Sequence, residues 1–421
     1  MKLKKKYIIN ILLTLFFLIF PVWIVFQELF YKLGIDSKNI KVVFLLIFLF
    51  FIFLLILNNN FKIHKVFFIN FILFLLLVFS VFVNINSGVF HLSYIIFGFY
   101  DIFFIYFMAI LIGFLSHKKL NENSLNYYFK LLFFLGIISI LFASIQKVYN
   151  SQVFYQFQNW MYLTKSRDIF RLNGIFLSHA WFASFLFFIL SWSFYIWKKT
   201  YKFKFFLIFL ICSIFLYWTY SKTFLMMAFA FVFLVLFFDR IITLKLRFIS
   251  KGYFVLFVLF CILLSCFLMI FVQDLEYTNK GFLYTASTKV RVYYWSIIIN
   301  DYFLDADLHN VIFGHTITQS GENDFLIKST GKVIQTENLF FTIYLWGGIL
   351  ALLVFVSAQY ILWKELFKRS NLFSKYLIIV LPIWFLGGIF GRTIGYYSFF
   401  CMMPALLSIN NQVVVCRKKE S

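Results

Sequence analysis

Residues 66–83 read VFFINFILFLLLVFSVFV, an apolar run that holds no charged side chain. Because a helix rises 1.5 Å per residue, a run of this length can cross the hydrocarbon core of a bilayer, which is roughly 30 Å thick. A chain in lipid has to satisfy its own backbone hydrogen bonds, and a helix does so within one segment. This stretch therefore predicts a transmembrane α-helix.

The composition extends this prediction to the whole chain. Of 421 residues, 63% are hydrophobic and only 13% are charged, and Phe alone occurs 67 times. A soluble domain carries about 25% charged residues, so the composition excludes a soluble enzyme. We predict an all-α, polytopic integral membrane protein that forms a single membrane domain over 1–421, with about twelve spans. The expected spans are about 8–28, 40–57, 66–83, 95–115, 129–145, 180–197, 205–220, 223–238, 253–272, 339–362, 377–390 and 393–409.

The last two spans share only the segment 377–409, which four glycines interrupt between 387 and 395. Two short helices and a re-entrant hairpin both fit this segment. Arg392 lies at its bend. A centrally buried Arg costs roughly 2.5–3.5 kcal/mol on insertion scales and tends to face a cavity or a partner. Arg392 is therefore a functional candidate if the hairpin is re-entrant, and a headgroup contact if the two helices are merely short.

The basic residues set the expected orientation. The formal net charge is +22, from 38 Lys and Arg against 16 Asp and Glu. Most of these bases fall between spans on one side, for example in 2–6, 198–204 and 417–419. The positive-inside rule then places both termini in the cytoplasm. The excess of positive charge then reflects membrane topology, because it marks the cytoplasmic segments. We therefore expect no nucleic-acid partner.

Two segments between spans are long, and both are expected outside. They are outer loop 1, about 146–179, and outer loop 2, about 273–338. Long loops are usually functional. Outer loop 1 ends in a basic stretch that includes Arg171. Outer loop 2 contains STKVRVYYWSIIINDYFL, which reads as a helix with Arg291 and Trp295 four residues apart on one face.

Four short motifs follow one another between 165 and 355. They are Arg171-Leu-Asn-Gly174-Ile-Phe176, then Trp218-Thr-Tyr-Ser-Lys222-Thr, then Arg291-x-x-x-Trp295 with Phe313-Gly314, and last Glu337-Asn338 with Gly347-Gly348. Their order and spacing resemble the O-antigen polymerase and O-antigen ligase superfamily. The resemblance implies a GT-C-like membrane glycosyltransferase in the bacterial inner membrane, with its active face in the periplasm.

Two departures from the family pattern bear on the choice within it. Lys222 stands where the family usually has Arg. Glu337 stands where ligases usually carry a His that is thought to be catalytic. The second departure favours a polymerase of O-antigen or capsular repeat units. Such an enzyme moves glycan from undecaprenyl pyrophosphate to a lipid-linked repeat.

Two alternatives remain open at this point. The first is a ligase that attaches finished glycan to lipid A core. The second, from another class, is a flippase or transporter for the lipid-linked oligosaccharide. Transporters often contain repeated halves and broken helices at the membrane midplane. No repeated half is visible in this sequence, and its distinctive polar residues fall in the two outer loops.

The resemblance implies roles for particular residues. The departing pyrophosphate needs cations, and Arg binds phosphate oxygens bidentately while staying charged. The candidates are Arg171, Lys222 and Arg291, together with Arg392, which rests on its place in the 377–409 segment more than on a motif. Such contacts raise the rate when they strengthen as charge develops on the leaving group, which makes Arg291 a catalytic candidate too. The alternative for each base is an interfacial anchor.

The attacking hydroxyl needs a base, and Glu337, His315 and His309 are the candidates. Glu337 also suits a helix N-terminus, and a solvated loop His is the plainer reading of His315. Asn338 would orient a sugar hydroxyl, and Trp295 would stack on a sugar face.

No cofactor is expected. The Cys and His spacings match no zinc site or disulfide framework, and no nucleotide-binding motif is present. We expect no metal, because the cationic side chains take the role that a metal would play. The expected partners are an undecaprenyl-pyrophosphate-linked oligosaccharide and membrane lipids, and a chain-length regulator is a further candidate.

Overall fold

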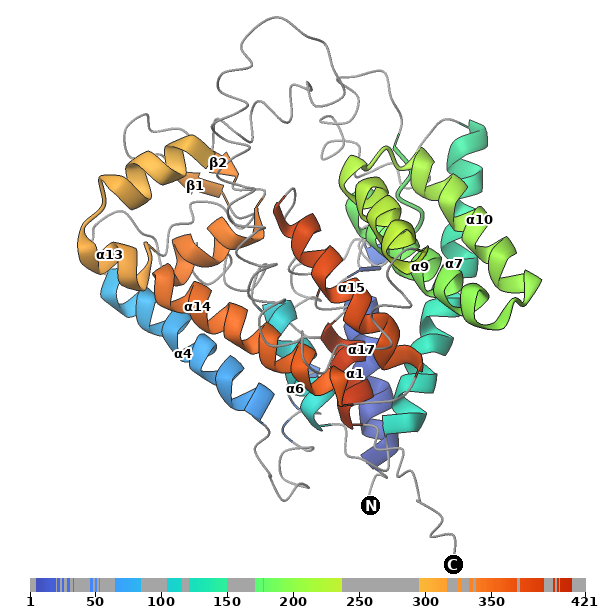
Figure 1. Ribbon diagram of the computed structural model, residues 1–421, viewed down its shortest axis with the longest axis horizontal. Coiled ribbons are helices and arrows are strands. Elements are labelled where there is room, and N and C mark those ends of the chain that lie inside the picture. Colours follow the sequence, from blue (N-terminus) through green and yellow to red (C-terminus); the bar gives the residue numbers. More distant parts are fainter. Residues whose placement is uncertain are drawn as a thin grey trace, which may run out of the picture.

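The computed structural model places a large part of the chain, and that part is predominantly helical (Figure 1). The described residues are 5–19, 21, 22, 25, 29, 30, 33, 46, 47, 50, 53, 65–84, 104–115, 121–149, 171–176, 178–236, 295–315, 324–326, 333–335, 338–368, 372–389, 397, 400 and 402–410. The helices are α1 (Lys5–Ile19), α4 (Lys65–Asn84), α6 (Ile105–Leu115), α7 (Asn121–Tyr149), α9 (His179–Thr200), α10 (Phe203–Trp218), a helix over Lys222–Leu236, the π-helix η3 (Asn300–Leu304), α13 (Leu308–Phe313), α14 (Leu339–Phe367), α15 (Leu372–Ile389) and α17 (Met403–Asn410).

A small β-hairpin is the one departure from the expected all-α class within the described residues. Strands β1 (Asp324–Leu326) and β2 (Val333–Gln335) pair antiparallel, with Phe325 opposite Ile334. Both lie in the polar part of outer loop 2. The β-branched pair Val333-Ile334 suits a strand, and the stretch is too short for a stable helix.

Four of the helices are long and apolar enough to cross a membrane: α4, α7, α9 and α14. Shorter apolar helices are α1, α10, Lys222–Leu236 and α15. All of them coincide with expected spans, which confirms a helical chain with membrane-length apolar segments. The full set of about twelve spans stays an expectation. Most of 40–57 and all of 253–272 lie outside the described residues.

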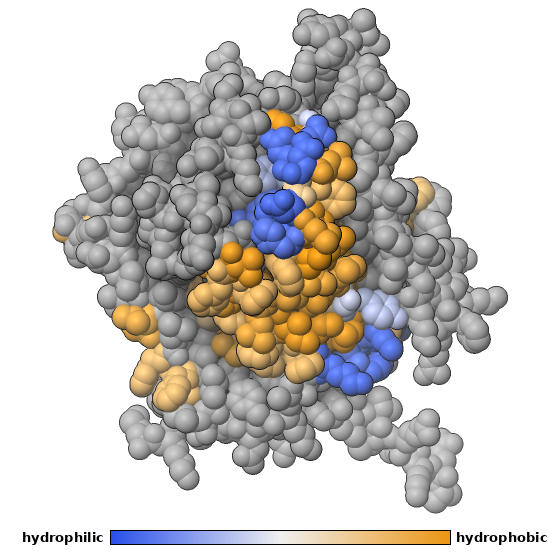
Figure 2. All heavy atoms as spheres, turned by 90° about the vertical axis from the view of Figure 1, so that its left-hand side faces the viewer, coloured by the Kyte–Doolittle hydropathy of each residue, from blue (hydrophilic) through white to orange (hydrophobic). Residues whose placement is uncertain are grey.

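Helix α4 has the two faces of a membrane helix. Its exposed face consists of large apolar side chains spaced three or four residues apart, namely Phe68, Phe71, Leu75, Phe79 and Phe82. Its only internal polar residues, Asn70 and Ser80, are buried. Figure 2 shows this exposed face as an apolar surface with hydrophilic residues at both of its ends. A water-soluble helix has the opposite arrangement, so lipid is the medium that fits this face.

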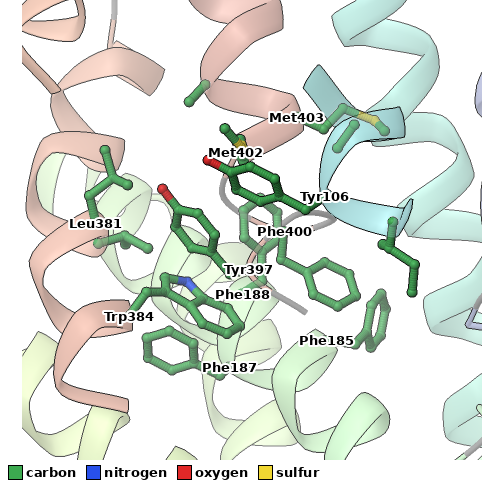
Figure 3. Close-up of a cluster of buried hydrophobic side chains, with 14 of the residues drawn as sticks. Tyr106, Phe185, Phe187, Phe188, Leu381, Trp384, Tyr397, Phe400, Met402 and Met403 are labelled. Atoms are coloured by element: carbon green, nitrogen blue, oxygen red, sulfur yellow. The ribbon is translucent and has the colours of Figure 1, made fainter. Parts of the chain in front are cut away.

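Helices α9 and α10 form an antiparallel hairpin, and α4 packs along α14 (Figure 1). Between these two groups lies α15. Trp384 of α15 contacts Phe187 of α9, at 5.8 Å between ring centroids, and the next residue, Phe385, contacts Phe340 of α14 at 6.1 Å. Figure 3 shows the buried cluster that forms where α6, α9 and α15 meet Tyr397, Phe400, Met402 and Met403. The core is therefore rich in aromatic side chains, which pack among Leu, Ile and Ala residues.

A chain of four buried polar side chains crosses this apolar core. Tyr397 donates to Oε1 of Gln359 on α14, and Nε2 of Gln359 donates to the hydroxyl of Tyr106 on α6 at 2.7 Å. The Tyr106 hydroxyl donates to Oδ1 of Asn70 on α4 at 2.6 Å, and Nδ2 of Asn70 donates to the carbonyl oxygen of Val66. Every proton points the same way along the chain. This series of hydrogen bonds links α14, α6 and α4 to Tyr397. Each polar atom of the four side chains has a hydrogen-bond partner, as an apolar surrounding requires.

A double-mutant cycle of Gln359→Leu and Tyr397→Phe should give a coupling energy of about 0.6–1.7 kcal/mol, the range found for interhelical hydrogen bonds in membranes. The reason is that both substitutions remove the same bond. The measurement is unfolding in mixed detergent micelles. Pairing Gln359→Leu with Tyr127→Phe is the control, because Tyr127 bonds Thr14 instead and the two effects should add. Equal coupling in the two cycles would contradict the prediction.

Candidate functional site

The first motif is held against the end of α7 by one buried side chain. Gln146 Nε2 donates to Oδ1 of Asn173 at 2.7 Å and to the carbonyl oxygen of Gly174 at 3.2 Å. Gln146 Oε1 accepts from the backbone amides of the same two residues, at 3.3 and 3.0 Å. We call this set of four bonds the clasp. It fixes the backbone just after Arg171.

The conformation of the clasped segment requires the glycine of the motif. Gly174 has φ 56°, a value that L side chains rarely adopt. A Cβ at this position would also overlap the hydroxyl of Ser139, which accepts from the amide of Ile175 at 3.4 Å. Glycine is therefore the residue that lets the segment lie directly on α7.

Substituting Gln146 by Leu should destabilise the protein by about 3 kcal/mol, because the buried amides of Asn173 and Gly174 lose their acceptor. Ser144→Ala is the matched control on the same helix. Among the described residues Ser144 bonds the carbonyl of Ile140, one turn earlier on its own helix, so its loss should cost less than about 0.5 kcal/mol. Detergent unfolding of both variants measures the difference, and similar stabilities would rule out the clasp as a structural anchor.

Arg171 meets His179 across the turn that leads into α9. Arg171 Nη1 lies 3.1 Å from Nε2 of His179, and both side chains are half-buried. A guanidinium has only donors, so Nε2 must be the acceptor and the imidazole is neutral in this pair. Ser178 caps α9 by accepting from the amide of Trp181 at 3.3 Å, which sets where the helix begins.

The second motif lies beside the first because α10 returns antiparallel to α9. Its turn begins at Trp218, the last residue of α10. The ammonium of Lys147, the neighbour of Gln146 on α7, lies 5.4 Å from the centre of the Trp218 ring. Lys222, which is exposed, starts the next helix after the turn. Lys147 is a cation that sequence reasoning missed, because a single Lys near the end of an apolar run carries no signal of its own.

The third and fourth motifs meet through their glycines. Gly314, with φ 88°, packs directly on the backbone of α14: a Cβ there would lie 2.6 Å from the amide nitrogens of both Gly347 and Gly348. Gly348, with φ 68° and ψ −167°, kinks α14, and a Cβ on it would overlap the carbonyl oxygen of Ile312. We call this contact the glycine crossing.

The glycine crossing also supplies a hydrogen bond to α14 beside the kink at Gly348. In a regular helix the carbonyl of Leu345 would accept from the amide of Ile349. The non-helical Gly348 immediately precedes that amide. The carbonyl of Leu345 accepts from the backbone amide of His315, at 2.8 Å. A backbone group within a membrane protein is costly to leave unpaired, so outer loop 2 completes α14.

The structure gives three of the expected site residues a clear local contact. His315 is buried, and its Nε2 donates to the carbonyl oxygen of Tyr302 at 2.9 Å. Asn338 caps α14, since its Oδ1 accepts from the amides of Phe340 and Phe341 at 2.9 and 3.2 Å. Trp295 is 1% exposed and packs against Phe341. These contacts hold the segments around the three residues in place. Their roles in catalysis or substrate binding stay predictions.

The end of α10 and the starts of α9, of Lys222–Leu236 and of α14 carry motif residues, and they lie at one end of the helix bundle, which we call the motif end. The glycine crossing lies further along α14, at Gly347 and Gly348. The clasp and Lys147 bring the start of α9 to the ends of α7 and α10. Trp384 of α15 contacts Phe224, two residues after Lys222, and Phe385 contacts Phe340, two residues after Asn338. The end of α15 therefore joins the two halves of the motif end. Arg291, Glu337 and Arg392 lie outside the described residues.

Within the described residues no group of His, Cys, Asp and Glu is arranged to hold a metal ion. His309 lies exposed on α13. Comparison of the chain with models of known families, with curated proteins and with solved structures finds no match.

Proposed function

We propose that the chain is a membrane glycosyltransferase that polymerises lipid-linked repeat units of O-antigen or capsular polysaccharide. The observation that carries the proposal is the gathering of the described motif residues at the motif end. Arg171 of the first motif, Lys222 of the second, Trp295 of the third and Asn338 of the fourth come from distant parts of the sequence. Packing of a helix bundle alone gives no reason for polar motifs to share one end.

The motif end suits a diphosphate leaving group. Arg171 is half-buried on a backbone that the clasp fixes, and Lys147 and Lys222 lie at the neighbouring helix ends. Cations held in place before the reaction stabilise charge that develops during it. In the reaction, a hydroxyl oxygen of the acceptor repeat attacks the anomeric carbon of the donor glycan. The bond from that carbon to the phosphate oxygen breaks, and undecaprenyl diphosphate leaves with the bond's electron pair.

The proton of the attacking hydroxyl goes to a base, for which Glu337 is our candidate. Glu337 precedes the cap residue of α14 in the sequence, and Asn338 fixes where that helix begins. His315 instead acts as a positioning residue on this account, because its Nε2 proton is used by the carbonyl of Tyr302. Arg291 and Arg392 complete the proposed set of cations.

The proposed location is the bacterial inner membrane, with both termini in the cytoplasm and the motif end in the periplasm. The apolar exposed face of α4 supports a location of the protein within a membrane. The distribution of Lys and Arg along the sequence supports the orientation.

An assay with purified protein in lipid nanodiscs tests the proposal. The substrate is a synthetic repeat unit on undecaprenyl diphosphate, and the expected product is a ladder of glycans that grow by whole repeats. Transfer of glycan to lipid A core without a ladder would identify a ligase instead. Movement of the lipid-linked repeat across vesicles, without any new glycosidic bond, would identify a flippase.

A further inference from the structure

The turn between α9 and α10 gathers basic side chains at the end of these two helices that lies opposite the motif end. The sequence of 198–204 holds four lysines and no acidic residue. Within the part of the chain that the structure describes, Lys198, Lys202 and Lys204 form no ion pair with a carboxylate. Lys202 and Lys204 are exposed, and Lys198 is half-buried. The turn therefore presents a basic surface that is separate from the candidate site.

The turn is tight, so its lysines are held close together. The amide of Tyr201 donates to the carbonyl of Trp197 at 2.7 Å, and Tyr201 has φ 53°, which ends α9. Helix α10 begins two residues later, at Phe203. Beside the turn, the ring of Trp197 packs on the ring of Phe206 in α10, at 4.8 Å between centroids. A ligand that binds several of these lysines therefore has little backbone left to order.

The helix dipoles explain only two of the four lysines. Lys198 and Lys199 lie in the last turn of α9, where a cation is favourable because that end of the dipole is negative. Lys202 and Lys204 lie at the start of α10, where the dipole is positive and a cation costs stability. The first turn of α10 has no acidic residue that would compensate. A bound anion would offset this unfavourable placement.

Two exposed aromatic rings indicate the medium in which such an anion lies. Tyr201 and Phe203 flank Lys202, and they are 75% and 71% exposed. Aromatic side chains collect where the lipid headgroups meet the acyl chains. Leu207 and Ile214 are also exposed and continue an apolar face along α10. The lysines of the turn therefore lie at the level of the lipid phosphates.

We propose that the α9–α10 turn binds an acidic phospholipid through its headgroup phosphate. Lys198, Lys202 and Lys204 bind the phosphate, and Tyr201 and Phe203 pack against the acyl chains. A lipid with net negative charge is the partner that this surface fits, since basic clusters at a membrane surface attract acidic lipids. The inference does not depend on the proposed function, because the turn lies at the far end of α9 from the motif residues.

The experiment measures binding of phosphatidylglycerol to the delipidated protein in neutral detergent by native mass spectrometry. The double variant Lys202→Gln/Lys204→Gln should raise the Kd about 20-fold, because each base near the surface contributes about fivefold to the affinity for acidic lipid. Lys202→Arg/Lys204→Arg keeps both charges and should stay within about threefold of the wild type. Phosphatidylcholine has a phosphate but no net charge, and it should bind the wild type and both variants equally weakly.

Lys364→Gln/Lys368→Gln is the matched control. Both lysines are exposed at the end of α14, and they flank Glu365, with which Lys368 pairs. Because Glu365 offsets their charge, this variant should bind phosphatidylglycerol within about twofold of the wild type. Equal losses of affinity in the two glutamine variants would overturn the inference, since the lysines of the turn would then act only through the general charge of the surface. Unchanged affinity in Lys202→Gln/Lys204→Gln would leave these bases a role in membrane topology alone.

Inorganic phosphate distinguishes a lipid site from a site for free phosphate. Phosphate in excess should displace no more phosphatidylglycerol than chloride does at the same ionic strength, because it lacks the acyl chains that pack on the aromatic rings. Displacement by phosphate alone would contradict the lipid as the ligand. If the double glutamine variant does not fold, Lys204→Gln is compared with Lys364→Gln, and a difference of about fivefold in Kd is expected.

Discussion

Replacement of Gly348 by Ala should remove most of the folded protein. Gly348 has φ 68° and ψ −167°, a region that is essentially restricted to glycine, and its new Cβ would overlap the carbonyl oxygen of Ile312. The neighbour is backbone and cannot rotate away, so the glycine crossing has to open. We expect a loss of about 4 kcal/mol or more, a large share of the net stability of a typical domain. The yield of monodisperse protein after detergent extraction and its melting temperature measure this loss.

Gly136→Ala provides the control for that experiment. Gly136 lies within α7, and the nearest atom to its added Cβ is the end of the Phe185 ring, at 3.2 Å. Alanine is also the better helix former, so this variant should stay within about 1 kcal/mol of the wild type. If the two alanine variants were equally stable, outer loop 2 would not pack on α14 through the glycine crossing.

Arg171→Ala should lower kcat/KM for the lipid-linked donor at least about 100-fold. Loss of one group that stabilises charge in a transition state typically costs about 2.7–4 kcal/mol. Arg171→Lys keeps the charge but not the planar fork of donors, so we expect an intermediate loss of about tenfold. The polymerisation assay in nanodiscs measures both variants. Each has to elute like the wild type from a sizing column, which shows that the clasp still holds.

A base at the other end of α14 serves as the comparison for Arg171. Lys368 is exposed and pairs with Glu365 on the same helix. A surface pair of this kind contributes little, so Lys368→Ala should keep nearly full activity. If Arg171→Ala retained more than half of the wild-type activity, the diphosphate would have to be bound elsewhere.

The long helices could be predicted from the sequence because each corresponds to a single continuous apolar run. The 66–83 run became α4, and the runs near 180 and 339 became α9 and α14. Burial within such a run was harder to predict, since both faces are apolar. Only the polar residues separate them: Asn70 and Ser80 lie on the buried face of α4, and Phe residues cover the exposed one.

The site was predictable as a set of short motifs and not as a set of contacts. Gly174 and Gly314 belong to motifs visible in the sequence, yet the reason for each glycine is a distant residue, Ser139 in one case and Gly347 in the other. Gln146 belongs to no motif and still makes every bond of the clasp. Long-range hydrogen bonds of this kind leave no periodic mark on a sequence, so only the folded chain reveals them.

The glycine crossing sets a limit on how this protein could be re-engineered. Because the amide of His315 donates to the carbonyl of Leu345 in α14, the described residues 295–315 of outer loop 2 belong to the scaffold. A graft that replaced the whole of 273–338 would remove that donor and disrupt the helix. An exchange restricted to 316–336 would leave the glycine crossing intact and would keep Glu337. Under the proposed function, chimeras meant to alter which sugars are joined should therefore place their first junction after His315.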